Sequence, residues 1–311
     1  QILSSIVSSQ TDIHNKYGGI VPELASRRHI EMIWPVVDEA LSAANISFDA
    51  VSAIAVCCGP GLIGSLLVGC GFAKAVGYVR NIPLVGVNHL EGHIFSVFLE
   101  KEKPEFPFLS LIASGGHTSL YIIDGFGQYK ELGRTRDDAA GEAYDKVSKL
   151  LGLGYPGGPL IDRLAGEGDA EAFEFPRAML PESFDFSFSG VKTAVKLVVA
   201  KDAGSLKNPV FLADIAASFQ ASVVDVLVRK VELAIIKTGI RTIVLSGGVA
   251  SNSGLRKKIN EMAHKREAKV FLPSPALCTD NAAMIASAGY YHYLAGDTAA
   301  LDLNPRAYLK L

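Results

Sequence analysis

The stretch VSAIAVCCGPGLIGSLLVGCGFAKAVGYV, residues 51–79, joins two apolar runs through a glycine-proline turn. Residues 53–58 are short, apolar and partly β-branched, which predicts a buried strand. Gly59-Pro60-Gly61 ends the strand, because these residue types favour turns. The residues that follow predict a helix. A strand, a tight turn and a helix in this order are typical of an α/β protein.

Two further stretches repeat this order. FPFLSLIASGGHTSLYIID, residues 106–124, predicts two strands joined by a hairpin at Gly115-Gly116. TIVLSGGVASNSGLRKKI, residues 242–259, predicts a strand, a turn at Gly247-Gly248 and a helix. Between them, apolar residues at helical spacing predict a long helix that Asp214 caps and that ends at Gly239, a helix serving core packing alone. We therefore expect a layered α/β fold.

The composition excludes several classes of protein. Hydrophobic residues make up 49% and charged residues 20%, as in a folded chain of one large or two ordinary domains. The net charge of −2 excludes a generally basic surface, so a nucleic-acid partner would need a local patch. The one basic stretch is LRKKINEMAHKREAK, residues 255–269, for which a solvated helix is an equally good interpretation.

The cysteines and the longest uncharged apolar stretch indicate in which cellular compartment the protein works. The cysteines have no C-x-x-C spacing, which favours reduced core residues in the cytoplasm: Cys57, Cys58, Cys70 and Cys278. Residues 54–73 are uncharged and long enough to span a membrane. The sequence Gly-Pro-Gly within them favours a strand, a turn and a helix instead, so we expect no membrane segment. Residues 2–9, ILSSIVSS, have a strand-like composition.

NHLEGH, residues 88–93, follows a predicted strand at 83–87. Asn88 is a good helix N-cap, which puts His89 and His93 one turn apart on one face, able to bind one metal ion. Glu91 lies about 200° around the helix from His89 and so faces away from such an ion. It cannot serve as the base of the zinc-protease motif H-E-x-x-H. The alternative is a pair of polar residues that make ordinary hydrogen bonds at the edge of a cleft.

A third metal ligand has two candidates. Asp280, in CTDNAAMIA, precedes a predicted helix, where a carboxylate can be a ligand or simply an N-cap. His117 is the other candidate, and the spacing leaves both open.

Three glycine-rich turns could bind phosphate. Residues 59–64 match G-x-G-x-x-G, but no acidic residue occurs between Asp49 and Glu91 to bind a ribose, so a tight turn is the better interpretation. Ser114–Thr118 and Gly247–Asn252 expose successive backbone N–H groups. A plain turn explains each of these two loops about as well, but two such loops in one chain favour a nucleotide.

Acidic and aromatic segments lie between these loops. DDAAGEAYDK, residues 137–146, places Asp138, Glu142 and Asp145 along one helical face, with Lys146 and Lys149 as expected partners. GYPGGP, residues 154–159, is typical of a rigid binding edge. SFDFSFSG, residues 183–190, predicts an irregular extended segment near a cleft.

Eight motifs in order make a specific resemblance. The chain resembles the tRNA threonylcarbamoyladenosine transferase family, of the bacterial (TsaD) type, over essentially its whole length. The motifs are YGGIVPELASR (17–27), GPGLIGSLLVG (59–69), NHLEGH (88–93), SGGHT (114–118), DDAAGEAYDK (137–146), YPGGP (155–159), DFSFSG (185–190) and CTDN (278–281).

The resemblance implies an actin-like, sugar-kinase-like α/β fold of two lobes, each on a ribonuclease-H-type mixed sheet. We expect an N-terminal lobe over residues 1–106, to which 283–311 return, and a C-terminal lobe over 107–282, with the junction in the charged, proline-containing KEKPEFP (101–107). Family members begin with a strand-turn-strand bearing Ser-Cys-Asp-Glu-Thr, and this chain starts beyond it. If that segment is truly absent, part of the first sheet and a phosphate or metal contact are missing; if it only lies outside this sequence, nothing changes.

The resemblance also implies the site. His89, His93 and Asp280 would hold one divalent metal, in place of a site with His117. By ligand type the metal would be iron or zinc, with magnesium as a third candidate. The implied nucleotide-binding residues are Ile112, Ala113, Ser114, Gly115, Gly116, Asp145, Gly158, Asp162 and Asn252. No residue stands out as a general base.

The implied reaction transfers a threonylcarbamoyl group from threonylcarbamoyl-adenylate to the exocyclic amine of the adenosine 3′ to the anticodon of tRNA, releasing AMP. The implied partners are tRNA, ATP or AMP, a small homologous subunit and an ATPase subunit, in the cytoplasm. A small-molecule kinase with Asp145 or Asp162 as its catalytic carboxylate, and a non-catalytic ATP-binding scaffold, are the alternatives.

Overall fold

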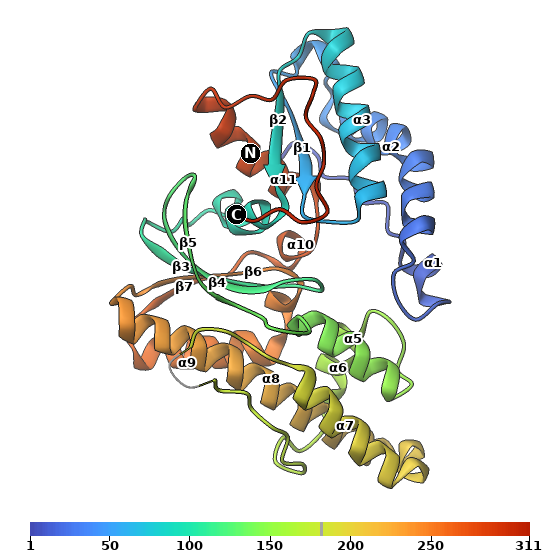
Figure 1. Cartoon of the computed structure of the whole chain (residues 1–311), viewed down its shortest axis with the longest axis vertical. Helices are drawn as coiled ribbons and strands as arrows, with labels where there is room; N and C mark the ends of the chain where they lie inside the picture. Colours follow the sequence, from blue (N-terminus) through green and yellow to red (C-terminus); the bar gives the residue numbers. More distant parts are fainter. Residues whose placement is uncertain (181–182) are drawn as a thin grey trace. The chain divides into compact units, whose positions relative to one another are not determined.

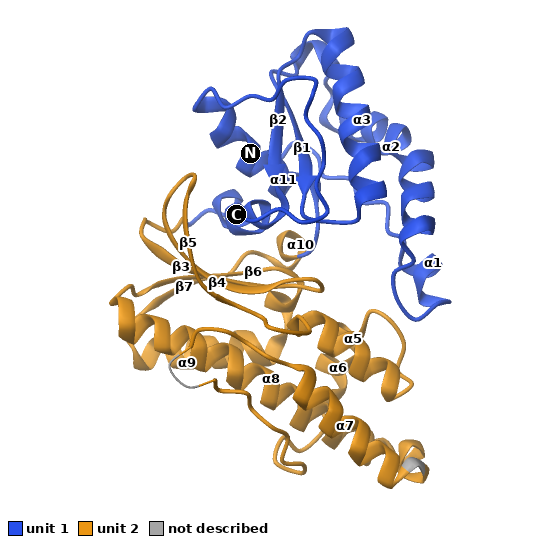
Figure 2. Cartoon of the chain, in the orientation of Figure 1, with its two compact units in different colours: residues 1–102, 279–311 blue, residues 103–278 orange. Residues whose placement is uncertain are grey.

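The computed structural model describes residues 1–180 and 183–311, and it is a mixed α/β structure (Figure 1). It comprises two compact units, residues 1–102 with 279–311 (unit 1) and residues 103–278 (unit 2) (Figure 2). The junctions lie at 102/103 and 278/279 rather than at the expected 106/107 and 282/283. Asp280, expected in the second lobe, therefore belongs to the unit that contains His89 and His93.

Unit 1 is built on the stretch from residue 51 to 88. The strands β1 (Ile54–Gly59) and β2 (Leu84–Asn88) form a parallel pair connected through α3 (Ile63–Arg80), as the sequence predicts. The helix α2 (Pro22–Ala44) packs against α3, and α11 (Ala282–Leu294) contacts both strands. Among the residues described, the sheet of unit 1 has these two strands.

The turn at Gly59-Pro60-Gly61 is covered by the C-terminal segment. The backbone N–H of Arg306 donates to the carbonyl of Cys58 (2.8 Å), and that of Gly61 donates to Ala307 (3.2 Å). A Cβ atom on Gly59, whose φ is +144°, would lie 2.2 Å from the carbonyl oxygen of Arg306. This close packing is what a tight turn requires, and it leaves the dinucleotide interpretation of the motif without support.

The N-terminal residues do not form the strand that their composition favours. Residues 1–10 have no regular secondary structure, and the Ser4 hydroxyl donates to the Ala40 carbonyl of α2 (2.8 Å). A strand needs a neighbouring strand for its backbone groups, and among the described residues no strand pairs with residues 1–10. Two short elements complete this region, α1 (Thr11–Asn15) and the 3-10 turn Phe48–Ala50.

Unit 2 contains a five-stranded mixed sheet in the order β5-β4-β3-β6-β7. Its strands are β3 (Phe108–Ala113), β4 (Thr118–Gly125), β5 (Gln128–Arg134), β6 (Thr242–Ser246) and β7 (Lys269–Phe271). The pairs β3–β4 and β4–β5 are antiparallel, whereas β6 is parallel to both β3 and β7. Ile112 pairs with Ser246, so the glycine turns that follow β3 and β6 leave the same edge of the sheet.

Helices bury one side of this sheet (Figure 1). They are α5 (Ala140–Leu150), α6 (Gly157–Ala165), α7 (Ser189–Lys201), α8 (Pro209–Thr238) and α9 (Ser253–Lys265), followed by the short α10 (Pro275–Cys278). The core joins Leu109, Leu111 and Leu120 of the strands to Tyr144 of α5 and Phe219 of α8. Burial of such side chains contributes roughly 1.5–3 kcal/mol each.

The long helix α8 begins earlier than the sequence predicts. Asn208 caps it by accepting from the Val210 N–H (3.0 Å), and Pro209 occupies its first turn. The prediction that Asp214 is the cap is therefore wrong, and the Asp214 carboxylate accepts from the Asp169 N–H (2.8 Å). Among the described helices, α8 alone is long and apolar enough to cross a membrane, and 72% of its apolar window is buried, as in a core helix. Residues 54–73 form β1, the turn and part of α3.

Candidate functional site

The helix α4 (His89–Phe95) starts at Asn88, as the sequence predicts. The side-chain oxygen of Asn88 accepts from the Leu90 N–H (2.9 Å), and its amide donates to the Lys310 carbonyl (3.0 Å). The imidazole rings of His89 and His93 lie on one face, with their centroids 4.8 Å apart. A 3-10 turn over Ser96–Leu99 continues the helix.

Asp280 completes a cluster with these histidines. Its Oδ1 lies 3.5 Å from Nε2 of His89 and 3.3 Å from Nε2 of His93. Asn281, not Asp280, caps α11 by accepting from the Met284 N–H (2.9 Å). Within the part of the chain that the structure describes, one ligand atom from each of His89, His93 and Asp280 lies within 4.8 Å of the others, and His117 is not in this group.

His93 carries the strongest sign of a bound metal. Its side chain is completely buried, and neither ring nitrogen makes a hydrogen bond among the described residues, although Oδ1 of Asp280 approaches Nε2 to 3.3 Å. A buried polar atom without a partner costs free energy, on the order of 1–3 kcal/mol, so native proteins rarely keep one without a reason. Two imidazoles and a carboxylate are a common donor set for a divalent transition metal. The residues present therefore fit such an ion.

Close packing between α4 and α11 brings the three ligands together. A Cβ atom on Gly92 would lie 2.8 Å from Cδ1 of Ile285, so only glycine allows this approach without a shift. The Ser287 hydroxyl of α11 donates to the Phe95 carbonyl at the end of α4 (2.9 Å). Asp280, directly before α11, is thereby fixed beside the histidines.

Glu91 is occupied elsewhere, as its position on the helix predicts. It is buried, and its two carboxylate oxygens lie 2.8 and 2.9 Å from Nε2 of His292. Nδ1 of His292 lies 2.8 Å from Asp297. The hydrogen bond to Glu91 raises the pKa of His292 to about 9. This ion pair, which the sequence reasoning missed, removes Glu91 from the role of a protease base.

In unit 2, the hairpin between β3 and β4 closes tightly. The Ser114 N–H donates to the His117 carbonyl (2.8 Å), and the His117 N–H donates to the Ser114 hydroxyl (3.1 Å). A Cβ atom on Gly141 would lie 2.8 Å from Cα of Gly115, so the first turn of α5 lies against the hairpin. Likewise, a Cβ atom on Gly247 would lie 2.4 Å from the Ala113 carbonyl oxygen. Both expected phosphate-binding loops and a helix N-terminus thus lie together.

A buried polar network joins two of the expected nucleotide-binding residues. Asn252 caps α9 and donates from its amide to Oε1 of Gln220 (2.6 Å), and Nε2 of Gln220 donates to Oδ1 of Asp162 (3.0 Å). Oδ2 of Asp162 accepts from the Ser253 N–H (2.9 Å), and Tyr144 also donates to Gln220 (3.4 Å). Gln220 is the central residue of this network. The expectation that α8 serves core packing alone is therefore wrong.

The remaining expected residues lie in the same unit. Asp145 accepts from the Gly157 N–H at the start of α6 (2.7 Å), and burial raises the pKa of its carboxyl. Nothing lies within 4 Å of where a Cβ atom of Gly158 would be, so this glycine borders open space. Ile112 and Ala113 are fully buried strand residues, which leaves their backbone as the part able to contact a ligand.

The carboxylates before α5 hold the segment around DFSFSG. Asp137 accepts from the hydroxyls of Ser187 (2.6 Å) and Ser189 (2.7 Å) and from the Phe188 N–H (2.8 Å). Asp138 pairs with Lys146 (2.7 Å) and Lys192 (3.2 Å). We had predicted that Asp138, Glu142 and Asp145 share one helical face. This prediction is wrong for Asp138, because it precedes α5. The contact of Asp137 with residues 187–189 was not predicted, because the two segments are about fifty residues apart in the sequence.

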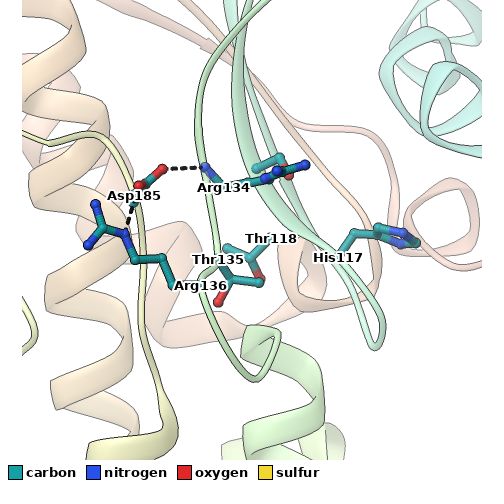
Figure 3. Close-up of a pocket in the computed structure, with 7 residues that line it drawn as sticks. His117, Thr118, Arg134, Thr135, Arg136 and Asp185 are labelled. Atoms are coloured by element: carbon teal, nitrogen blue, oxygen red, sulfur yellow. Dashed lines mark hydrogen bonds and ion pairs between the residues drawn. The ribbon is translucent and has the colours of Figure 1, made fainter. Parts of the chain in front are cut away.

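A polar hollow lies beside this segment (Figure 3). It measures about 550 Å³ and is lined by His117, Thr118, Ser119, Arg134, Thr135, Arg136 and Asp185. His117 and Thr118 also end the glycine hairpin, so the hollow continues from the expected nucleotide site within unit 2.

Comparison with known proteins identifies the family. A model described as tRNA N6-adenosine threonylcarbamoyltransferase matches residues 1–287. The chain belongs to this family. A protein of that name from Thermodesulfovibrio yellowstonii is 60% identical over 313 residues, covering 100% of this chain and 93% of the relative. A relative of the same name from Syntrophotalea carbinolica is 54% identical and covers 99% of this chain and 90% of its own length. Another from Clostridioides difficile is 52% identical and covers 100% of this chain and 92% of its own length.

Solved structures agree with the fold. Full-length HypF in its phosphate- and nucleotide-bound form superimposes with a TM-score of 0.57 at 15% identity, over 83% of this chain and 41% of that chain. HypF from T. kodakarensis gives a TM-score of 0.59 at 15% identity, over 85% of this chain and 44% of that chain. The threonylcarbamoyltransferase chain thus spans less than half the length of HypF, and at this identity the likeness concerns the fold alone.

Proposed function

We propose that the chain transfers a threonylcarbamoyl group from threonylcarbamoyl-adenylate to the N6 amine of the adenosine 3′ to the anticodon of tRNA, with release of AMP. The family match over residues 1–287 is the observation that carries the proposal, since it makes the chain an enzyme acting on a tRNA adenosine. Relatives named for this activity at 52–60% identity over essentially the whole chain support it. The adenylate donor and the position of the adenosine come from the family resemblance.

We also propose the actin-like, sugar-kinase-like architecture. Its support is the mixed sheet of unit 2, in which an antiparallel set, β5-β4-β3, continues into two parallel strands, β6 and β7. The likeness to HypF is consistent with it. The two-stranded sheet of unit 1 is smaller than the ribonuclease-H-type sheet expected for each lobe.

The acyl-adenylate would bind at the glycine turns of unit 2. Backbone N–H groups of Gly115 and Gly116 would contact its phosphate, because those of Ser114, Ala140 and Gly141 already donate within the hairpin and the start of α5. Asp162 and Asn252, fixed by Gln220, would contact the nucleoside. Positioning of the donor against the amine would supply much of the rate, because the described chain offers no evident general base.

His89, His93 and Asp280 would hold one divalent metal, iron or zinc, and a bound metal would supply Lewis-acid polarisation of a carbonyl or phosphoryl oxygen. The buried ring nitrogens of His93, which make no hydrogen bond within the described part of the chain, support this assignment. The chain's own contribution is to keep both imidazoles on one face of α4 and Asp280 against them.

Partner subunits would complete the enzyme in the cytoplasm. We propose that a small homologous subunit packs on an apolar surface across α2 and α3, formed by Ile30, Trp34, Ile63 and Leu67, whose side chains are all exposed. The two helices pack closely together, since a Cβ atom on Gly64 of α3 would lie 2.3 Å from Oγ of Ser26 on α2. An ATPase subunit is a further proposed partner. No membrane attachment is proposed, since within the described residues the one apolar helix of sufficient length is the core helix α8.

A small-molecule kinase or an ATP-binding scaffold is less well supported. A kinase would need an available carboxylate as its base, whereas Asp162 accepts from Gln220 and from both the N–H and the hydroxyl of Ser253. Asp145 accepts only one bond, from the Gly157 N–H to Oδ1, and against a kinase that uses it the support is the family match.

Incubation with the proposed partner subunits, threonylcarbamoyl-adenylate and unmodified tRNA, followed by nucleoside analysis, tests the activity. The expected product is threonylcarbamoyladenosine, with AMP released in equal amount. If the donor is consumed without any modified adenosine in the tRNA, the proposed reaction is wrong.

The metal assignment has a separate test, metal content measured by elemental analysis. Replacement of both His89 and His93 by alanine should reduce bound metal from about one per chain to background, since the donor set loses two of three ligands. His264→Ala, which removes an exposed histidine of α9 in unit 2, is the matched control and should keep the metal. Equal metal content in all three proteins would refute the site.

A further inference from the structure

The polar hollow of unit 2 has no role in the function proposed above. All seven lining residues carry polar side chains, and they come from three segments: residues 117–119, 134–136 and Asp185 (Figure 3). The lining has two arginines and one histidine but a single carboxylate; the Arg136 guanidinium lies against Asp185, whereas the side chains of Arg134 and His117 extend away from it (Figure 3). The lining therefore favours an anionic ligand.

Asp185 sets the geometry of the arginines. Its Oδ2 accepts from Nε of Arg136 (2.8 Å), and its Oδ1 accepts from the backbone N–H of Arg134 (3.1 Å). A guanidinium has five N–H donors, and the bond to Asp185 uses one of those of Arg136. The Arg134 side chain is 56% exposed, and its Nε makes only a long contact of 3.8 Å with Glu131. Both guanidinium groups can thus offer donors to a ligand.

The hydroxyl groups connect the hollow to the start of α5. Oγ1 of Thr118 accepts from the Ala140 N–H (2.8 Å), and the Thr135 hydroxyl donates to the Asp138 carbonyl (2.7 Å). These bonds fix both walls of the hollow. Because Ala140 is the first residue of α5 and Gly141 lies against the hairpin, the hollow adjoins the loop proposed to bind the donor phosphate.

We propose that this hollow binds the phosphate backbone of the tRNA substrate, with Arg134 and Arg136 each contacting one phosphate. The inference rests on the proposed function. Arginine forks match phosphate oxygens, and most contacts between proteins and nucleic acids go to the phosphate backbone. With a net charge of −2, the chain must contact a polyanion through a local patch of this kind.

Two other interpretations fit less well. The basic stretch at 255–269 uses three of its charges internally: Arg256 donates to the Ala250 carbonyl (2.6 Å), Lys258 pairs with Asp225, and Arg266 pairs with Glu232 (2.7 Å). The carboxylate of a small donor would need one guanidinium, not an open hollow of about 550 Å³ with two arginines that are more than half exposed.

Steady-state kinetics and tRNA binding across a salt series test the proposal, with the partner subunits present. We expect R134A and R136A each to raise the KM for tRNA about tenfold while leaving the KM for threonylcarbamoyl-adenylate unchanged. The slope of log K against log salt should become shallower by about 0.7–1 for each variant, as for the loss of one phosphate contact. The R134K variant keeps the positive charge, so its slope of log K against log salt should stay close to that of the wild type. R241A, which breaks an exposed arginine–glutamate pair at 2.8 Å elsewhere in unit 2, is the control and should behave as wild type.

Each other outcome decides against one idea. Unchanged tRNA binding and salt slope in folded R134A and R136A, confirmed by thermal melts, would overturn the phosphate site. A higher KM for the donor with an unchanged KM for tRNA would assign the arginines to the donor and overturn it as well. A wild-type protein that binds tRNA with the expected dependence on Arg134 but produces no modified adenosine would refute the proposed reaction and leave the phosphate site standing.

Discussion

Gln220 shows how one core residue can set the orientation of a site. Its amide oxygen accepts from Asn252 and its amide nitrogen donates to Asp162, so a single side chain fixes two proposed nucleoside contacts. A Cβ atom on Gly254 would lie 2.9 Å from Nε2 of Gln220, so the surrounding backbone is packed closely against this amide. The sequence carried a signal, a glutamine within a helix face otherwise made of apolar and small residues.

Gln220→Leu should therefore impair donor binding. The substitution keeps the volume but removes the acceptor that the buried Asn252 amide and Tyr144 hydroxyl share, which costs about 1–3 kcal/mol. We expect the KM for threonylcarbamoyl-adenylate to rise about tenfold and the KM for tRNA to stay constant. Gln128→Leu, at the exposed start of β5, is the control. A loss of thermal stability with an unchanged KM for the donor would show that Gln220 has only a structural role.

The pairing of α4 with α11 depends on contacts that a sequence pattern cannot supply. Helical periodicity predicted that Glu91 faces away from His89, and the structure agrees. It could not predict that the partner of Glu91 is His292, two hundred residues downstream on α11, because no local pattern relates them. The same holds for Asp280, whose place beside the histidines follows from Gly92 packing on Ile285.

The ion pair between Glu91 and His292 makes the contact between α4 and α11 sensitive to pH. The pKa of His292 is raised in the folded state to about 9, so its stabilisation is fully present below the unfolded pKa of roughly 6.5 and is lost as pH rises through about 9. The contribution is on the order of 2–3 kcal/mol at pH 6.

Denaturant unfolding of wild type and His292→Gln at pH 6 and pH 10 measures this contribution. The difference in unfolding free energy between the two proteins should be large at pH 6 and should nearly vanish at pH 10. Taking the difference cancels the other groups that titrate in this range. A difference that stays constant across pH would show that the charge of His292 does not stabilise the fold.

For the whole molecule, the sequence predicted what is local or ordered along the chain. The stretch at 51–79, the hairpin at Gly115-Gly116 and the start of α4 at Asn88 form as expected, because each depends on neighbouring residues. Contacts between segments far apart in the sequence could not be predicted. Examples are the contact of Asp137 with Ser187 and Ser189 and the place of Asp280 in unit 1. Strand-like composition at residues 2–9 also misled, because composition does not say whether a segment pairs with a strand, and here Ser4 instead donates to the Ala40 carbonyl of α2.

The exposed apolar surface of α2 and α3 gives a prediction at the scale of the assembly. Trp34, 54% exposed, lies with its ring centroid 6.4 Å from that of Phe72 on α3, so it is held in place while much of its apolar area faces solvent. Large exposed aromatic side chains of this kind are frequent energetic centres of protein interfaces.

Trp34→Glu should weaken binding of the small homologous subunit at least tenfold in calorimetry, since a charge would be buried where an aromatic ring packs. Tyr308→Glu is the matched control, because Tyr308 is 94% exposed in the C-terminal segment of the same unit and lies outside the α2–α3 surface. It should bind the subunit as wild type does. If both variants bind equally well, the partner occupies a different face; if Tyr308→Glu alone binds weakly, the interface involves the C-terminal segment instead.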